Sequence, residues 1–258
     1  MDTVQIFFRT PNTRNQNEVL DKVHSYLAAL AQNGQVIDDH TPLARARGGY
    51  VVTVSVPEST ALADRVGNKW VRKRLRELGH VGVERPKVKH LGADPESRAP
   101  CRCRTRPFLI LFTTFLNAEP PLRCGACFGP IPLYKIPATN EAGNHQDVLW
   151  WQETYQAMDW LFIGTGPGEK FAHHQLSRPD SPLSKDGREL ARALEKSVRL
   201  PVYYYLYKHF GRSDEAERKR KCPSCRKNWL RKEPLHRNFD FQCRRCRLLS
   251  NVAFEVRL

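Results

Sequence analysis

Cys222-Pro-Ser-Cys225 and Cys243-Arg-Arg-Cys246 are two CxxC pairs separated by seventeen residues near the end of the sequence. Each CxxC turn can direct two thiolates at one ion at about 2.3 Å, and a hairpin between the turns can bring the pairs together tetrahedrally. The spacing therefore predicts a zinc ribbon over residues 213–258, with these four cysteines as ligands. Because four protein thiolates leave no open coordination position, we expect this Zn²⁺ to be structural and not catalytic.

Cys101-Arg-Cys103 and Cys124-Gly-Ala-Cys127 form another group of four cysteines, here separated by twenty residues. The CxxC half is an ordinary zinc turn, whereas the CxC half requires two close positions on one strand to bind the same ion. This pattern predicts a second structural Zn²⁺. A redox pair and unligated cysteines are the alternatives, because CxxC also occurs in thiol oxidoreductases.

The charge of the chain is strongly basic. Its 258 residues include 42 Lys or Arg and 27 Asp or Glu, for a formal net charge of +15. Such a balance is typical of proteins that bind phosphates or another polyanion, and a solvated basic surface is the plainer alternative.

The start of the sequence, Met1-Asp-Thr-Val4, lacks the basic and apolar segments of a secretory signal. The longest nearly apolar stretch, residues 108–116, has nine residues, whereas a membrane-spanning helix needs about 20. We therefore expect a cytoplasmic protein with no membrane partner. In that compartment the eight cysteines stay reduced, which favours metal ligation over disulfides.

The first 95 residues contain no cysteine and alternate strand-like and helix-like patterns. Their order predicts a βαββαβ unit, which is the ferredoxin-like arrangement. The expected strands are 4–9, 35–39, 50–57 and 85–90, and the expected helices are 15–31 and 64–78. The predicted fold class is α+β, with a ferredoxin-like domain at 1–95, an α+β domain carrying the first cysteines at 96–212, and the zinc ribbon at 213–258.

The middle of the sequence predicts a strand at 107–116, helices at 147–162 and from Ser184 onward, and a strand at 203–207. The stretch 164–182, rich in Gly, Pro and Ser, predicts a long loop between the helices. Its glycines match neither the phosphate loop GxxxxGK[ST] nor the dinucleotide fingerprint GxGxxG. With no nucleophile or open metal site marked by the sequence, we expect no enzyme, and a hydrolase or nuclease is the least supported class.

The last fifth of the chain holds most of the excess charge, because residues 208–258 contain fifteen Lys or Arg and six Asp or Glu. Cations that pair with phosphates, beside rings that stack on bases, are typical of a single-stranded nucleic-acid site. The alternative is that the rings are core residues and the cations offset thiolate charge. The predicted contact residues are Arg226, Lys227, Trp229, Arg231, Lys232, Arg244, Arg245 and Arg247, and the sequence does not choose between DNA and RNA.

Several stretches together resemble a known family. They are RPFLILFT (106–113), PLRCGACFGPIPLY (121–134), YYYLY (203–207), CPSC (222–225), Trp229 and FDFQCRRCRLLSN (239–251). Through them the chain is similar to an uncharacterised bacterial family described as zinc-ribbon-containing, for which nucleic-acid binding is conjectured. The resemblance covers roughly residue 100 to the end. It implies zinc ligation at the matching cysteines and nucleic-acid contact, and no established activity.

Zinc ribbons also serve as docking platforms for proteins, so a protein partner is the competing prediction. One example is an immunity protein that inhibits a toxin nuclease in the same bacterium. Salt separates the two possibilities. Phosphate contact weakens steeply as salt rises, whereas a protein interface with an apolar core need not weaken.

Overall fold

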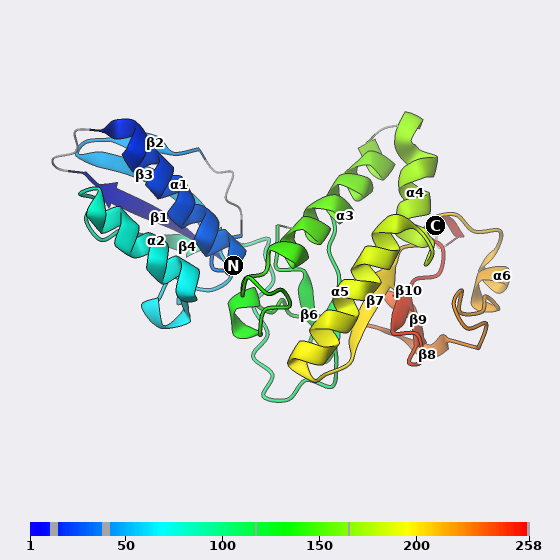
Figure 1. The fold of residues 1–258 in the computed structure, drawn as a ribbon. Helices are drawn as coiled ribbons and strands as arrows, with labels where there is room; N and C mark the ends of the chain where they lie inside the picture. The colour runs from blue at the N-terminus through cyan, green and yellow to red at the C-terminus, as the bar shows by residue number, and fades with distance from the viewer. Residues whose placement is uncertain (11–14, 38–41, 117, 165, 257–258) are drawn as a thin grey trace. The chain divides into compact units, whose positions relative to one another are not determined.

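Two β-sheets and their helices give the computed structural model a mixed α+β architecture, divided between two compact units (Figure 1). The structure describes residues 1–10, 15–37, 42–116, 118–164 and 166–256. The first unit comprises Met1–Pro100, Ala118–Pro120 and Pro130–Gln146, and the second comprises Cys101–Asn117, Pro121–Gly129 and Asp147–Leu258. The domain boundaries predicted after residues 95 and 212 stay predictions. Every described helix falls short of the length and apolar character needed to span a bilayer.

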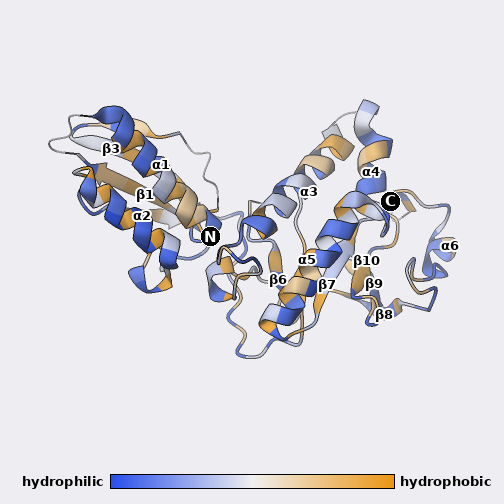
Figure 2. Ribbon diagram, in the orientation of Figure 1, coloured by the Kyte–Doolittle hydropathy of each residue, from blue (hydrophilic) through white to orange (hydrophobic). Residues whose placement is uncertain are grey.

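The sheet of the first unit has the order β2-β3-β1-β4, and all its neighbouring strands are antiparallel. In β1, Val4, Ile6 and Phe8 are buried and alternate with more exposed residues, because successive side chains of a strand point to opposite faces. Two helices pack on the apolar face (Figures 1 and 2). The elements are β1 (Asp2–Arg9), α1 (Gln16–Gln32), β2 (Ala44–Ala46), β3 (Gly49–Val56), the 3₁₀ turn η1 (Asp64–Val66), α2 (Lys69–His80) and β4 (Lys87–Ala93). The predicted order βαββαβ is present.

One predicted strand, 35–39, is wrong as far as the structure describes it. Residues 35–37 form a bend after α1, and residues 38 and 39 lie outside the described residues. Gly34 ends the helix with a φ of 73°, a value that glycine adopts without strain. Gln35 then turns inward and donates from Nε2 to the Ala61 carbonyl oxygen at 2.7 Å. A buried amide bonded across the core replaces the expected strand, and β2 forms later.

The sheet of the second unit has the order β6-β5-β7-β10-β9-β8. The pairs β5–β7 and β7–β10 are parallel, and the other described pairs are antiparallel. The strands are β5 (Leu109–Leu111), β6 (Leu122–Cys124), β7 (Val202–Leu206), β8 (Leu230–Leu235), β9 (Phe239–Cys243) and β10 (Leu248–Ser250). Since β6 ends at Cys124 and β9 ends at Cys243, one sheet carries a ligand candidate from each cysteine group.

Helix α5 packs directly on β7 because Gly187 has no side chain. A Cβ atom at Gly187 would lie 2.2 Å from Cε2 of Tyr204 and 2.5 Å from Nε1 of Trp151. Ser181 caps the helix by accepting a hydrogen bond from the Ser184 amide at 3.2 Å. The remaining elements are η2 (Leu133–Lys135), α3 (Gln146–Gly164), η3 (Gly166–Gly168), α4 (Glu169–Ser177), α5 (Pro182–Val198), α6 (Asp214–Arg218) and η4 (Phe254–Val256).

The loop predicted at 164–182 contains a helix, α4 (Glu169–Ser177). Ala172, Gln175 and Leu176 are buried at helical spacing. The flanking glycines and prolines obscure this short pattern in the sequence.

Candidate metal centres and the adjoining basic surface

The second cysteine group consists of Cys222, Cys225, Cys243 and Cys246. Their Sγ atoms all lie within 4.8 Å of one another, and Cys225 Sγ is 3.6 Å from Cys243 Sγ. Four sulfurs around one zinc at about 2.3 Å would be about 3.8 Å apart, whereas a disulfide joins sulfurs at about 2.05 Å. All four cysteines are free. The spacing therefore fits a shared metal ion.

The first cysteine group consists of Cys101, Cys103, Cys124 and Cys127, and its Sγ atoms also lie within 4.8 Å of one another. The CxC half does bring both of its sulfurs to the group, as the sequence requires for a shared ion. Arg106 adds a positive charge, because its Nε donates to Cys101 Sγ at 3.5 Å. The structure thus assembles both predicted ligand sets, each of which could hold a metal ion.

The three CxxC turns share an unusual backbone. The residue after each second cysteine is left-handed, and these residues are Phe128 with φ 61°, Arg226 with φ 60° and Arg247 with φ 53°. Such values are uncommon outside glycine and cost roughly 1 kcal/mol or more. The next residue in the chain then directs its backbone amide at sulfur, as when Gly129 N–H donates to Cys127 Sγ at 3.4 Å and Lys227 N–H donates to Cys225 Sγ. Amides aimed at sulfur favour the thiolate, the form that binds metal.

Hydrogen bonds to sulfur lower the pKa of one thiol in each group. Burial raises the pKa of Cys101, but the hydrogen bond from Arg106 and the Cys103 amide outweigh it and bring that pKa to about 7. The Lys227 amide lowers the pKa of Cys225 to about 7, against an opposing effect of burial. Each group therefore has one thiol that loses its proton near neutral pH and can bind a metal ion first.

The structure separates the predicted nucleic-acid contacts into two sets. Arg226, Lys227, Lys232, Arg244 and Arg245 are exposed. Arg231 is partly buried, where its Nη1 donates to Gln242 Oε1 and its Nε donates to the Glu233 carbonyl oxygen. Arg247 is partly buried and forms an ion pair with Glu195 at 3.0 Å.

Trp229 is not part of this exposed set, since only 3% of it is accessible. Its Nε1 donates to the Arg220 carbonyl oxygen at 2.9 Å, and its ring lies 5.0 Å from that of Phe241. The Arg220 guanidinium lies 5.2 Å from the centre of the Trp229 ring. No face of this ring is open to a base, and we leave Trp229 out of the contact surface.

Helix α5 contributes cations that the sequence analysis did not select. Lys185, Arg188, Arg192 and Lys196 follow one another at spacings of three, four and four residues, which places them on one face of a helix. Asp186 and Glu189 line a different cavity, shared with α3. Because the helix was predicted, this spacing could have identified the four cations as one face. The sequence does not show which segment of the chain lies beside that face.

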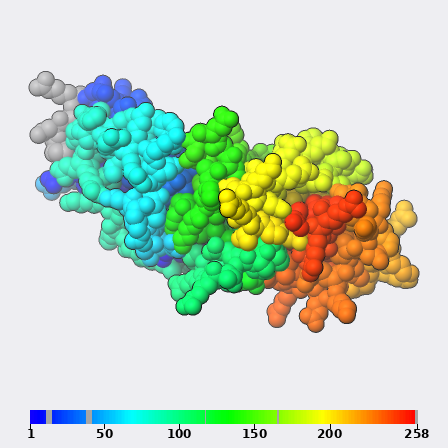
Figure 3. Space-filling model, turned by 60° about the horizontal axis from the view of Figure 1, so that its bottom comes forward, coloured from blue at the N-terminus to red at the C-terminus, as the bar shows by residue number. Residues whose placement is uncertain are grey.

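The neighbour of this face is the second cysteine group. One cavity of about 700 Å³ is lined by Arg188, Arg192, Lys196, Arg244, Arg245 and Arg247. A second cavity, also of about 700 Å³, is lined by Arg178, Lys185, Arg188, Lys208, Arg220 and Arg226. Because Arg188 lines both cavities, we treat them together as the cation groove. Figure 3 shows the yellow surface of α5 beside the red surface near the end of the chain.

Few carboxylates balance the charge of the cation groove. Among its lining residues, Asp180 pairs with Arg178 at 3.3 Å and Glu195 pairs with Arg247 at 3.0 Å. Within the described part of the chain, no ion pair involves Lys185, Arg192 or Lys196, nor the turn residues Arg226, Arg244 and Arg245. The groove is therefore a surface of largely uncompensated positive charge.

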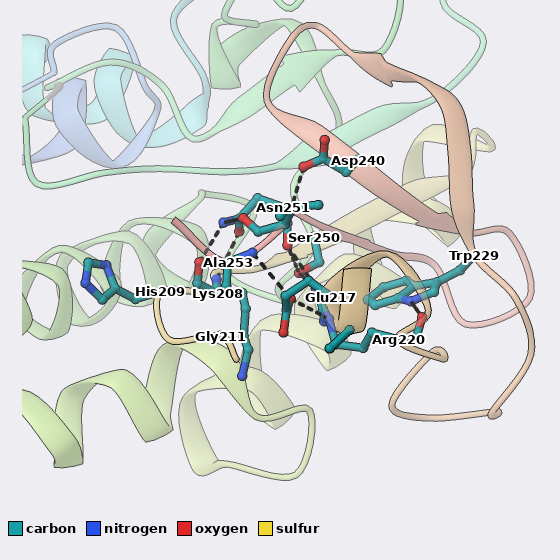
Figure 4. A network of polar contacts seen from close by, with 12 residues as sticks. Lys208, His209, Gly211, Glu217, Arg220, Trp229, Asp240, Ser250, Asn251 and Ala253 are labelled. Carbon is teal, nitrogen blue, oxygen red and sulfur yellow. Dashed lines mark hydrogen bonds and ion pairs between the residues drawn. The ribbon is translucent and has the colours of Figure 1, made fainter. Parts of the chain in front are cut away.

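A buried polar network fixes the floor of the groove (Figure 4). Arg220 donates from Nη2 to the Asn251 carbonyl oxygen at 2.8 Å and lies 3.1 Å from Glu217 Oε2. The Asn251 side chain in turn accepts from the Lys208 amide at 2.9 Å and donates to the Lys208 carbonyl oxygen at 2.6 Å. Asp240 accepts from the Val252 amide at 2.6 Å. These contacts fix the segment before Cys222 to β10 and to the end of β7.

Comparison with known proteins places the chain in a family. Three family models, each described as a domain of unknown function, match residues 1–92 (DUF8589), 103–207 (DUF2310) and 211–256 (DUF8594). A Haemophilus influenzae protein described as uncharacterized is 33% identical over 259 residues, covering 98% of this chain and 99% of that protein. The chain belongs to the same bacterial family. This confirms the predicted kinship with uncharacterised bacterial proteins, while the zinc ribbon stays a prediction.

Two further matches cover less of the chain. A second uncharacterized protein of Haemophilus influenzae is 42% identical over 145 residues, which is 56% of this chain and 71% of that protein. A crystal structure from Deinococcus radiodurans, titled as a candidate antibiotic biosynthesis monooxygenase, matches 36% of this chain and 93% of its own at 14% identity and a TM-score of 0.27. That likeness carries no argument for the family's fold or activity.

Proposed function

We propose that this chain is a nucleic-acid-binding protein in which two structural Zn²⁺ ions organise the second unit. The second cysteine group, with β8, β9 and β10, would be the zinc ribbon, and the first unit would be a ferredoxin-like domain. Four thiolates are a soft donor set suited to zinc, and they leave no open position for catalysis. The metal centres therefore stabilise the fold and carry no reaction.

The observation that carries the proposal is the place of Arg226, Arg244 and Arg245. All three follow or lie inside the cysteine turns of the second group, and all three line the cation groove together with α5. A metal ion that fixes the turns would therefore also fix the cations. Phosphates bound there would release counterions, which is the main source of sequence-independent affinity for nucleic acids.

The groove favours contact with the phosphate backbone over contact with bases. Among the residues that line it, the only ring belongs to Tyr204, whose exposed fraction is 0%. Phe239 and Phe241 on β9, the strand that ends at Cys243, are also fully buried. Stacking of unpaired bases on aromatic side chains, expected from the sequence, is therefore not part of the proposal, and binding should depend little on base sequence.

The test compares the removal of charge inside and outside the groove. Binding of labelled DNA and RNA oligonucleotides, single- and double-stranded, is measured for the parent, for Arg192→Ala/Lys196→Ala on α5, and for Arg72→Ala/Lys73→Ala on α2. Both double variants remove two exposed positive charges. We expect the α5 variant to bind at least tenfold more weakly and the α2 variant to stay within about twofold of the parent. Equal weakening by both variants would mean that net charge, and not the groove, attracts the nucleic acid.

Exposed aromatic side chains support the alternative proposal, that the chain binds a protein partner. Trp150 and Trp160 on α3 are 63% and 59% exposed, and Phe171 on α4 is 58% exposed. Aromatic residues of this kind anchor protein interfaces. If the chain is a protein-interaction module, such as an inhibitor of a toxin nuclease, Trp150→Ala and Trp160→Ala should weaken capture of that partner while leaving oligonucleotide binding unchanged.

A further inference from the structure

The half of the cation groove near the CPSC turn differs from the other half. Three separate segments bring cations to it: the turn after α4 supplies Arg178, the start of α5 supplies Lys185 and Arg188, and residue 226 follows the second cysteine of the turn. Lys208 and Arg220 lie deeper and are partly buried. Six cations face this cavity with a single lining carboxylate, Asp180, which is paired with Arg178 at 3.3 Å, and Arg220 is paired behind the lining with Glu217 at 3.1 Å. For convenience we call it the Lys208 cavity.

Lys208 is a partly buried cation of this cavity without an ion pair among the described residues. No described carboxylate forms an ion pair with its ammonium group. Burial lowers the pKa of Lys208, the charges of Arg220 and Arg178 lower it further, and Glu217 acts in the opposite direction. The backbone of Lys208 is fixed in place, because the Asn251 side chain forms hydrogen bonds with both the amide and the carbonyl oxygen of Lys208. A partly buried cation held among other cations is unfavourable until an anion joins it.

The other half of the groove is also lined by six cations and one carboxylate, Glu195, which pairs with Arg247. Its other cations are the shared Arg188 and four exposed residues, Arg192, Lys196, Arg244 and Arg245, whereas the unpaired Lys208 is partly buried. An internal phosphodiester carries one negative charge, whereas a phosphate monoester carries about −1.5 to −2 at neutral pH. The more highly charged group gains more beside Lys208, because the charge of this unpaired cation is less screened by water than the charges of the exposed cations in the other half.

The geometry points to the Lys208 cavity as the site of a terminal phosphate monoester on a nucleic-acid strand, whose remaining phosphates follow α5 toward Arg244 and Arg245. This inference rests on the proposed nucleic-acid binding. From Lys185 to Lys196 the helix rises about 16 Å at 1.5 Å per residue. That length corresponds to about five phosphates of a strand with a rise of 3.4 Å.

The experiment uses the full-length protein and three labelled oligonucleotides of one sequence, carrying a 5′-phosphate, a 3′-phosphate or only hydroxyl ends. Affinity is measured by fluorescence anisotropy at one salt concentration. We expect one of the two phosphorylated strands to bind about tenfold more tightly than the hydroxyl strand. Inorganic phosphate is the competitor, and it should reduce this preference without displacing the hydroxyl strand, which would separate recognition of the end from recognition of the strand.

Three variants test whether the preference for a terminal phosphate arises at the Lys208 cavity. Lys208→Met and Lys185→Ala should each bring the affinity ratio of the phosphorylated to the hydroxyl strand close to one. Since Lys185 is exposed on α5, its variant tests the site even if Lys208→Met fails to fold. Arg244→Ala/Arg245→Ala should weaken all three strands alike and keep their ratio. Equal affinity of the parent for all three strands would overturn the terminal-phosphate site but leave the proposed function standing, whereas no binding of any strand would overturn both.

Discussion

Arg247 forms a two-point ion pair with Glu195, with Nε 3.0 Å from Oε2 and Nη2 3.1 Å from Oε1. Arg247 follows the last cysteine, and Glu195 lies on α5. The pair thus joins the two walls of the cation groove, one formed by the cysteine turn and the other by the helix. It also explains why one arginine of the predicted contact set is already engaged by a carboxylate.

This ion pair predicts a pH dependence of stability. The hydrogen bond from Arg247 lowers the pKa of Glu195, although burial opposes it. A carboxylate whose pKa is lowered by folding stabilises the protein above its usual pKa, and the effect is lost as pH falls through the lowered value. Because the side chains of Arg247 and Glu195 are 37% and 32% exposed, Glu195→Gln should reduce the free energy of unfolding at neutral pH by at most about 1 kcal/mol.

Urea unfolding of the parent and of Glu195→Gln at a series of pH values measures this contribution. The difference between the two proteins should be present at neutral pH and disappear in acid. A difference of equal size at every pH would show that Glu195 acts through packing or through its hydrogen bond to the Val202 amide.

The network under the groove predicts a much larger effect for Arg220. Arg220→Ala leaves Glu217, which is 7% exposed, without its cation. Removing one partner of a buried pair typically costs about 3–5 kcal/mol. Arg218→Ala is the matched control, because it breaks a pair with Asp214 in which both side chains are about half exposed, at 56% and 49%.

Chemical denaturation should place Arg218→Ala within about 1 kcal/mol of the parent and Arg220→Ala well below it. If both variants are destabilised by the same small amount, the Arg220 network does not hold the segment before Cys222 in place.

The two cysteine groups predict about two zinc ions per chain, since four thiolates bind one tetrahedral ion. Cys243→Ser should lower this to about one and make the C-terminal part of the second unit sensitive to protease, because binding energy at a structural zinc is also folding energy. The first unit should stay resistant. Elemental analysis of the purified variant, prepared without chelator, gives the count.

Cys103→Ser provides the matching experiment on the first cysteine group. It should also lower the zinc count by about one and should leave the second group's ion bound. Parent-level zinc in both variants, or none in the parent, would rule out the proposed metal centres.

The sequence was sufficient for the parts of the fold that follow a regular pattern. The strand predicted at 4–9 corresponds to β1, and both ligand sets were identified because CxxC and CxC spacings bring sulfurs together locally. The strand at 35–39 failed because the Gln35 amide is buried by a bond to the Ala61 carbonyl oxygen, which lies 26 residues further along the chain. Sequence patterns carry no information about such a distant partner.

The cation groove required the tertiary structure for a similar reason. Strands β7 and β10 are parallel neighbours that are far apart in sequence, with Tyr204 paired with Leu248. This pairing carries the last cysteine turn to α5, which packs on β7 through Gly187. The spacing of Arg188, Arg192 and Lys196 could be read from the sequence, but not that these side chains line one cavity with Arg244. Trp229 was predicted as a contact residue but is buried. The local sequence could not show this, because a ring beside cations can be exposed or buried.

The central claim, that cations fixed by the second cysteine group bind phosphates, is tested by the salt dependence of oligonucleotide affinity in the parent and in Arg244→Ala/Arg245→Ala. Both arginines are exposed and line the groove, so their removal should leave the fold and the zinc content unchanged. We predict weaker binding and a plot of log K against log salt that is shallower by about 0.7 to 0.9 for each phosphate that the variant no longer binds. Unchanged affinity and slope in a folded variant with its full zinc content would contradict the claim and leave these arginines only to balance thiolate charge.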